Sequence, residues 1–126
     1  MTDADIGIVE SELCITVPSF LKRWFLQNPF RNFPHPTRCL VCNRDRLIHE
    51  NIVLRRQGYY GREWPDQMLW IGDDWSGGAY FVDASENSPG IFWYDWEEGK
   101  GEMVLPAYSE RHSPDEFIDY ISRLSQ

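Results

Sequence analysis

Two adjacent aspartates, a tryptophan and a glycine pair occupy the stretch WIGDDWSGGAYFVDAS, residues 70–85. Three kinds of site use such residues: paired carboxylates for acid–base catalysis, a glycine-rich phosphate loop, and a turn whose rim contacts another protein. A phosphate loop leads into a helix, whereas Gly77 and Gly78 lead into the strand-like run AYFVDA. The carboxylates of Asp73 and Asp74 would also repel a phosphate. We therefore interpret the stretch as a tight turn with an aspartate that caps backbone N–H groups.

Acidic residues dominate the second half of the chain. Residues 63–126 contain fourteen acidic and three basic side chains, residues 20–62 contain two acidic and nine basic ones, and the formal net charge is −8. Carboxylate pairs can hydrolyse glycosides, but no substrate-groove pattern accompanies these, so we expect no enzyme. The acidic excess repels nucleic acid and attracts basic proteins, so we expect no nucleic-acid binding. Ordinary solvated surface is the alternative for the acidic residues.

A candidate metal site lies in the segment HPTRCLVCNRDRLIH. Cys39 and Cys42 have the spacing of half a zinc site, and His35 and His49 could supply two further ligands. The histidine spacings match no standard zinc finger, so we expect two reduced, partly buried thiols, no metal and no cofactor. A zinc ion that holds this segment together is the alternative. Cys14 lacks the signature of a catalytic nucleophile and is expected to pack within the first helix pair.

Helical spacing begins near the N-terminus. A short helix is predicted from the apolar positions Ile6, Val9 and Leu13. A second helix is expected to begin at Pro18, where a missing N–H is tolerated, and to end by Asn28, because a proline follows. The apolar face of this second helix is predicted at Phe20, Leu21, Trp24 and Phe25.

The middle of the chain gives weaker signals. Residues 28–45 contain several prolines and are interpreted as a loop with a short extended piece at 39–42. Residues 47–56 fit either a strand or a short helix, and the following segment QGYYGREWPDQ is expected to be a loop.

Strand patterns begin at Met68. The runs MLWI, AYFVDA, IFWYDW and EMVLPA predict strands at residues 68–71, 79–84, 91–96 and 102–107. The short turns between them favour an antiparallel meander of about four strands, and the first strand is expected to be central. Alternate rings of IFWYDW should point to opposite faces of the sheet, one packed on helices and the other either covered or exposed.

The C-terminal segment has the clearest helix signals. Ser113 fits an N-cap, Pro114 the first helical position and Glu116 the third, which is the pattern of a capping box. An apolar stripe then follows at Phe117, Tyr120, Ile121 and Leu124. We expect this helix to lie against the sheet. The sequence therefore predicts a single α+β domain over residues 1–126, an antiparallel meander flanked by N-terminal helices and a C-terminal helix.

Length and composition restrict the class of protein. The 126 residues, 42% of them hydrophobic and 15% aromatic, suit one folded domain. No apolar run approaches the roughly 20 residues that cross a bilayer, and the acidic N-terminus lacks a secretory signal pattern. We therefore expect a cytoplasmic protein without membrane contact. The odd number of cysteines, three, argues against a disulfide framework.

The order of these elements resembles the SUKH superfamily, also called the Smi/Knr-like domain. The resemblance extends over residues 6–26 and is strongest over residues 69–121. It rests on Val17-Pro18 at the start of a helix, the run from Ile71 to Gly78, Asp83 at the end of a strand, Trp93, Asp95 and Trp96 in the next strand, and Phe117 with Tyr120 and Ile121 in the closing helix.

This resemblance implies a non-enzymatic α+β domain that binds proteins, without a cofactor or a catalytic residue set. Many bacterial members look like immunity proteins that bind a toxin domain, often a nuclease. Eukaryotic relatives act as scaffolds in cell-wall regulation. We therefore expect an immunity protein that neutralises a cognate toxin by occluding its surface. A scaffold or regulatory protein-interaction module without a toxin partner is the alternative.

The partner is expected to be a basic toxin domain, because an acidic surface would mimic nucleic acid and accelerate association with a nuclease. Exposed tryptophans beside acidic residues suit such an interface. We expect the chain itself to be a monomer or weak dimer. The predicted docking surface consists of Glu63, Trp64, Asp73, Asp74, Trp75, Trp96, Glu97 and Glu98.

Overall fold

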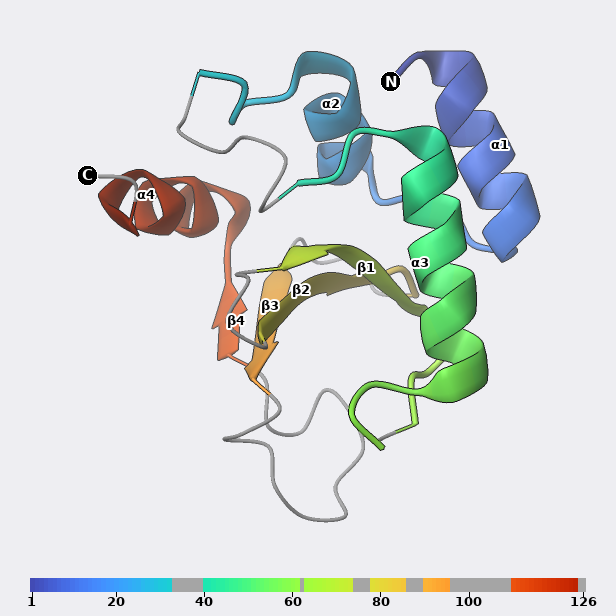
Figure 1. Ribbon diagram of the computed structural model, residues 1–126. Helices are drawn as coiled ribbons and strands as arrows, with labels where there is room; N and C mark the ends of the chain where they lie inside the picture. The colour runs from blue at the N-terminus through green and yellow to red at the C-terminus, as the bar shows by residue number, and fades with distance from the viewer. Residues whose placement is uncertain (33–39, 62, 74–77, 86–89, 96–109, 125–126) are drawn as a thin grey trace.

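The computed structural model describes residues 1–32, 40–61, 63–73, 78–85, 90–95 and 110–124 (Figure 1). The helices within these ranges are α1 (Asp3–Leu13), α2 (Ser19–Gln27), α3 (Arg44–Gln57) and α4 (Pro114–Leu124). The strands are β1 (Met68–Asp73), β2 (Gly78–Asp83), β3 (Ile91–Asp95) and β4 (Glu110–His112). These elements confirm the predicted α+β fold class. No helix in the described ranges has the length and apolar composition to span a membrane.

The strands form one antiparallel sheet in the order β1-β2-β3-β4, which confirms the predicted meander. One detail of the predicted sheet was wrong, and another lies outside the described residues. β1 is an edge strand of this sheet, although the run MLWI was expected to be central. The expected fourth strand at 102–107 lies outside the described residues, among which the fourth strand is Glu110–His112.

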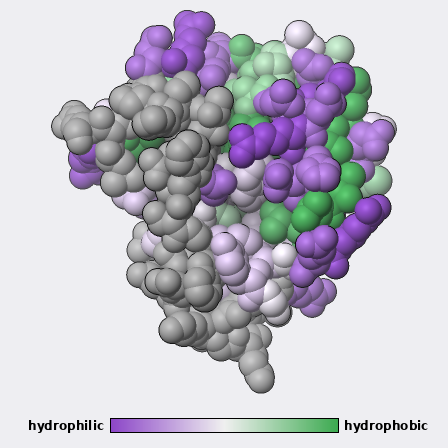
Figure 2. Space-filling model, viewed as in Figure 1, coloured by the Kyte–Doolittle hydropathy of each residue, from purple (hydrophilic) through white to green (hydrophobic). Residues whose placement is uncertain are grey.

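The helices surround the sheet in a simple arrangement. Figure 1 shows α2 and α4 over one side of the sheet and α3 alongside it, with α1 against α3. On the side drawn in Figure 2, hydrophilic residues of α1 and α3 predominate, with smaller apolar areas between them. α3 lies beside the edge strand β1.

Residues 44–57 form a helix. Of the two structures predicted for residues 47–56, the helix is therefore confirmed and the strand is wrong. Asn43 caps the helix, because its side-chain oxygen accepts a hydrogen bond from the Arg46 N–H at 2.9 Å. Arg55 and Arg56 lie in the last turn, where positive charge interacts favourably with the helix dipole. The helix ends at Gln57, and the capping residue that follows it is Gly58, whose φ of 75° suits glycine.

Asn51 of α3 pairs with the free edge of β1. Its side chain is fully buried and donates to the carbonyl oxygens of Leu47 at 2.8 Å and Trp70 at 3.0 Å. Its side-chain oxygen accepts a hydrogen bond from the Trp70 N–H at 2.8 Å. The adjacent Ile71 carbonyl accepts from the Val41 N–H at 2.8 Å. An edge strand normally presents unpaired backbone groups, so these contacts take the place of a neighbouring strand.

The first helix follows the predicted apolar spacing and is capped by Thr2. Thr2 and Asp5 form a capping box, in which the Thr2 N–H donates to the Asp5 carboxylate at 3.0 Å. This bond, with the Thr2 hydroxyl and the nearby Arg44, holds the pKa of Asp5 below its usual value. The expectation for Cys14 was wrong. It is exposed, because it ends the helix in a left-handed conformation with φ of 54°.

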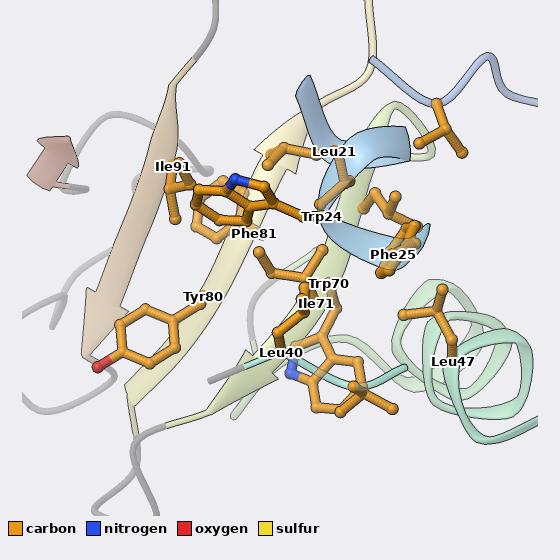
Figure 3. Packing of buried hydrophobic residues seen from close by; sticks show 14 of the residues in the cluster. Leu21, Trp24, Phe25, Leu40, Leu47, Trp70, Ile71, Tyr80, Phe81 and Ile91 are labelled. Carbon is orange, nitrogen blue, oxygen red and sulfur yellow. The ribbon is translucent and has the colours of Figure 1, made fainter. Parts of the chain in front are cut away.

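Aromatic side chains join α2 and α4 to one face of the sheet. Figure 3 shows Leu21, Trp24 and Phe25 of α2 directed toward the sheet, as predicted from their helical spacing. The Phe117 ring of α4 stacks on Trp24, with ring centroids 5.9 Å apart, and contacts the Tyr80 ring of β2 edge-on at 4.9 Å. This cluster confirms that the C-terminal helix lies against the sheet.

The opposite face of the sheet is covered by the segment that follows α3. The Phe81 and Phe92 rings stack across β2 and β3 at 5.3 Å, and Trp64 contacts Phe81 at 5.3 Å. Tyr59 contacts Tyr94 of β3 at 5.8 Å. Phe92 and Tyr94 of β3 are therefore buried on this face, and Trp93 is partly buried against the core on the face of the helices. The face of Phe92 and Tyr94 is thus covered, which was one of the two expectations from the alternation of the strand.

The N-cap of α4 provides a local test of the fold. The Glu116 N–H donates to the Ser113 hydroxyl at 3.2 Å, as the sequence predicted. Replacing Ser113 with alanine is expected to lower the free energy of unfolding by about 1 kcal/mol, because a helix N–H loses its acceptor. Urea unfolding followed by circular dichroism measures this. Ser113→Asp keeps an acceptor and should match the unchanged chain, whereas equal losses in both variants would contradict the capping role.

Candidate functional site

The described members of the predicted docking surface occupy different environments. Glu63 is exposed, and Asp73 is half-buried at the end of β1. Asp74, Trp75, Trp96, Glu97 and Glu98 lie outside the described residues, so their place in a docking surface stays a prediction.

The structure contradicts the prediction that Trp64 belongs to the docking surface. The side chain is only 2% exposed, and its indole N–H donates to the Met68 carbonyl at 2.8 Å. Its ring also contacts Phe81 and Tyr59. Trp64 therefore belongs to the core beneath the sheet, because a buried indole with a satisfied N–H has no surface left for a partner.

The candidate zinc ligands are described only in part. Cys42 is half-buried just before α3, and burial raises the pKa of its thiol, which disfavours the thiolate that binds metals. His49 is exposed on α3. His35 and Cys39 lie outside the described residues. Among the residues that the structure describes, no three His, Cys, Asp or Glu side chains are grouped to hold a metal ion.

A pocket of about 480 Å³ lies between α3, the segment after it and the first two strands. We call it the α3–sheet pocket. Its volume is within the range of about 300–1,000 Å³ that is usual for ligand sites. The pocket is lined by Glu50, Leu54, Tyr59, Tyr60, Trp70, Asp73, Gly78 and Ala79.

An irregularity in β1 brings Trp70 and Asp73 to the same face of the sheet. Residues three apart in a regular strand point to opposite faces. The register of β1 against β2 shifts between Trp70 and Gly72, so Trp70 pairs with Phe81 and Asp73 pairs with Ala79. Phe81 and Ala79 are two apart and share a face, so their partners do too. The β-bulge therefore turns Asp73 toward the pocket.

The helix and the second strand supply the other walls. Glu50 and Leu54 are four residues apart on α3, so they project from one face of the helix beside Asn51. Ala79 lies on the same face of the sheet as Phe81, yet it carries only a methyl group. A small residue therefore lines the pocket at a position whose cross-strand neighbour on this face, Tyr94, is aromatic.

Two tyrosines in the turn after α3 also line the pocket. The Tyr59 and Tyr60 rings meet edge-on at 4.8 Å, and Tyr60 is 57% exposed. Tyr60 has a φ of 49°, a left-handed conformation that costs a residue other than glycine roughly 1–2 kcal/mol. Further along the chain, the Arg55 Nη2 donates to the Asp66 carbonyl at 2.7 Å, which ties that backbone to the end of α3.

The chemistry of the lining favours a cation. Glu50 and Asp73 contribute two carboxyl groups, and three aromatic rings lie around them. Among the described residues that line the pocket, none is basic, and none is a serine, cysteine or histidine. Carboxylates attract a positive charge, and aromatic faces add cation–π attraction. The described lining is therefore suited to binding a cationic group.

Sequence reasoning identified Asp73 but missed Glu50, Tyr59 and Tyr60. Glu50 and Leu54 could have been recognised as a helical i, i+4 pair only after residues 44–57 were known to be a helix. The pair Tyr59-Tyr60 between two glycines was interpreted as an ordinary loop. Its aromatic composition was the available signal.

Comparisons of the chain with family models, curated proteins and solved structures gave no match. The resemblance to the SUKH superfamily therefore stays a prediction.

Proposed function

We propose that this chain is a protein-binding immunity protein, which neutralises a basic toxin domain by covering its working surface. The sequence supports this through its resemblance to the SUKH superfamily and through the acidic excess of its second half. An acidic surface attracts a basic partner and increases the rate of association. The proposal requires no catalytic step in this chain.

The observation that carries the proposal is the position of Asp73. This residue belongs to the predicted docking surface, and it lies in the α3–sheet pocket together with Glu50. The pocket combines carboxylates and aromatic rings at Asp73, which belongs to the acidic stretch that the sequence selected. Interfaces rely on a few such aromatic and charged positions for most of their affinity.

Co-expression with a toxin tests the proposal. A secreted-toxin domain encoded beside the gene of this chain should stop growth of a bacterial host. Co-expression of this chain is expected to restore the viable count, because the bound protein blocks the toxin's surface. Plating of cells with and without the chain measures the effect, and size-exclusion chromatography of the two purified proteins shows whether they form a complex.

Charge reversal provides the control. Glu50→Lys combined with Asp73→Lys should abolish protection, because both changes place positive charge where a basic partner docks. Glu12→Lys, on the exposed surface of α1, is the matched control and should still protect. Circular dichroism verifies that each variant is folded. If the unchanged chain neither restores growth nor forms a complex with the toxin, the immunity proposal is wrong.

A further inference from the structure

We propose that the α3–sheet pocket binds the guanidinium group of an arginine side chain that the partner protein presents. This inference rests on the proposed function, and it names the chemical group of the partner that is recognised. Neither the acidic turn nor the family resemblance specifies such a group, since both imply only general charge attraction.

The two carboxyl groups approach the pocket from different elements. Glu50 is half-buried on α3, and Asp73 is half-buried on β1, so the positions of both are set by the fold. A guanidinium has five N–H donors in a planar arrangement and can bond to more than one carboxylate. An ammonium is a more strongly hydrated point charge and matches such a site less well.

The aromatic residues provide surfaces for a flat cation. Trp70 lines the pocket but is only 5% exposed, whereas Tyr60 is 57% exposed, so the accessible ring face among these two is that of Tyr60. A guanidinium stacks on aromatic faces, and its methylene stem packs against apolar groups. Leu54, which is half-buried, offers such an apolar contact beside the rings. The lining therefore matches both the charged end and the apolar stem of arginine.

The pocket is organised before any ligand enters. The β-bulge fixes Asp73 on the face of Trp70, and Asn51 fixes the backbone of Trp70 to α3. Arg55 also ties the backbone of Asp66, further along the chain, to the end of α3. A site that is ordered in advance loses less entropy on binding, which favours a specific ligand over general charge attraction.

A titration with a small guanidinium compound tests the inference on the whole chain. N-acetyl-arginine amide is added to ¹⁵N-labelled protein, and the indole N–H resonance of Trp70 is followed by NMR. We expect saturable binding with a Kd on the order of 1 mM. N-acetyl-citrulline amide has nearly the same shape without the charge and should give no saturable shift. N-acetyl-lysine amide should bind about fivefold more weakly than the arginine compound.

Neutral variants of the pocket complete the test. Glu50→Gln should weaken binding of N-acetyl-arginine amide by about tenfold, because it removes one charged acceptor without changing the shape. Asp73→Asn should have a similar effect. Glu12→Gln removes a charge from the exposed surface of α1 and should leave Kd within about twofold. Unchanged binding in Glu50→Gln, or equal binding of the arginine and citrulline compounds, would overturn the inference.

A peptide distinguishes a partner's side chain from a free metabolite. The pentapeptide Gly-Gly-Arg-Gly-Gly with blocked ends should bind at least as tightly as N-acetyl-arginine amide. If free arginine binds and this peptide does not, the pocket accepts a small molecule and the inference is wrong. The titrations contain no toxin, so failure of the pocket to bind is separable from failure of the chain to protect cells.

Discussion

Replacing Asn51 with alanine is expected to lower the free energy of unfolding by about 3 kcal/mol, because the Trp70 N–H and carbonyl lose their partners inside the protein. Unsatisfied buried groups cost about 1–3 kcal/mol each, and the higher helix propensity of alanine offsets only a few tenths of this. The loss is a large part of the roughly 5–15 kcal/mol that stabilises a typical domain. Urea unfolding followed by circular dichroism measures it.

His49→Ala is the matched control, because His49 is exposed on the same helix. Its effect should stay within about 0.5 kcal/mol. Hydrogen exchange gives a second measurement, in which the Trp70 amide should exchange faster in Asn51→Ala than in His49→Ala. Equal stabilities and equal Trp70 exchange in the two variants would show that Asn51 does not hold the edge of β1.

Asn51→Asp separates hydrogen-bond donation from acceptance at the same position. An ionised aspartate accepts from the Trp70 N–H but cannot donate to the carbonyl of Trp70 or Leu47. Burial raises the pKa of such a carboxyl above its value in the unfolded chain. Relative to the unchanged chain at each pH, this variant should therefore lose stability as pH rises from the unfolded pKa through the folded pKa. A loss that is independent of pH would contradict the burial of this side chain.

Replacing Phe117 with alanine is expected to lower the free energy of unfolding by about 4 kcal/mol, because the change leaves a cavity where α4 meets α2 and the sheet. The Phe117 ring is fully buried and contacts the rings of Trp24, Phe30 and Tyr80. Loss of the ring removes contacts on three sides at once, so α4 should also lose protection from hydrogen exchange. Urea unfolding and hydrogen exchange by mass spectrometry measure the two effects.

Two variants control for this result. Phe117→Leu keeps most of the apolar volume and should cost clearly less than the alanine variant. Ile118→Ala removes a partly buried neighbour on the same helix and should also cost less. If Ile118→Ala destabilises the protein as much as Phe117→Ala, the aromatic cluster is not what fixes α4 on the sheet.

The burial of Trp64 changes how the predicted docking surface should be tested. A substitution of this residue would weaken the core that covers Phe81, and lost binding would then report misfolding. Glu50 and Asp73 are better positions, because they line a pocket and can be exchanged for isosteric amides. Substitutions of Glu50 and Asp73 therefore test partner binding better than a substitution of Trp64.

Local sequence signals predicted most of the helices and three of the strands. The stripe at Phe20, Leu21, Trp24 and Phe25 is buried as its spacing indicated. The cap at Ser113 is present, and strands occur at the first three aromatic and β-branched runs. These features depend on residues within about one helical turn or one strand, so the sequence contains the required information.

The candidate site was harder to predict, because its residues come from separate elements. Asp73 was selected for its charge, but nothing local placed Glu50 opposite it. Tyr59 and Tyr60 were assigned to a loop, although that loop covers one face of the sheet. Knowledge of which elements are neighbours was needed before these side chains could be recognised as one pocket.

The sequence by itself determined the α+β class, three of the described helices, three of the described strands and the apolar faces of the predicted helices. Only the tertiary structure decided that Trp64 is in the core, that Asn51 completes the edge of β1, and that a β-bulge turns Asp73 toward Trp70. The physical reason is the separation along the chain of the residues that determine each feature. Helix and strand periodicity are set by neighbouring residues, whereas a one-residue shift in strand register depends on pairing with a distant segment.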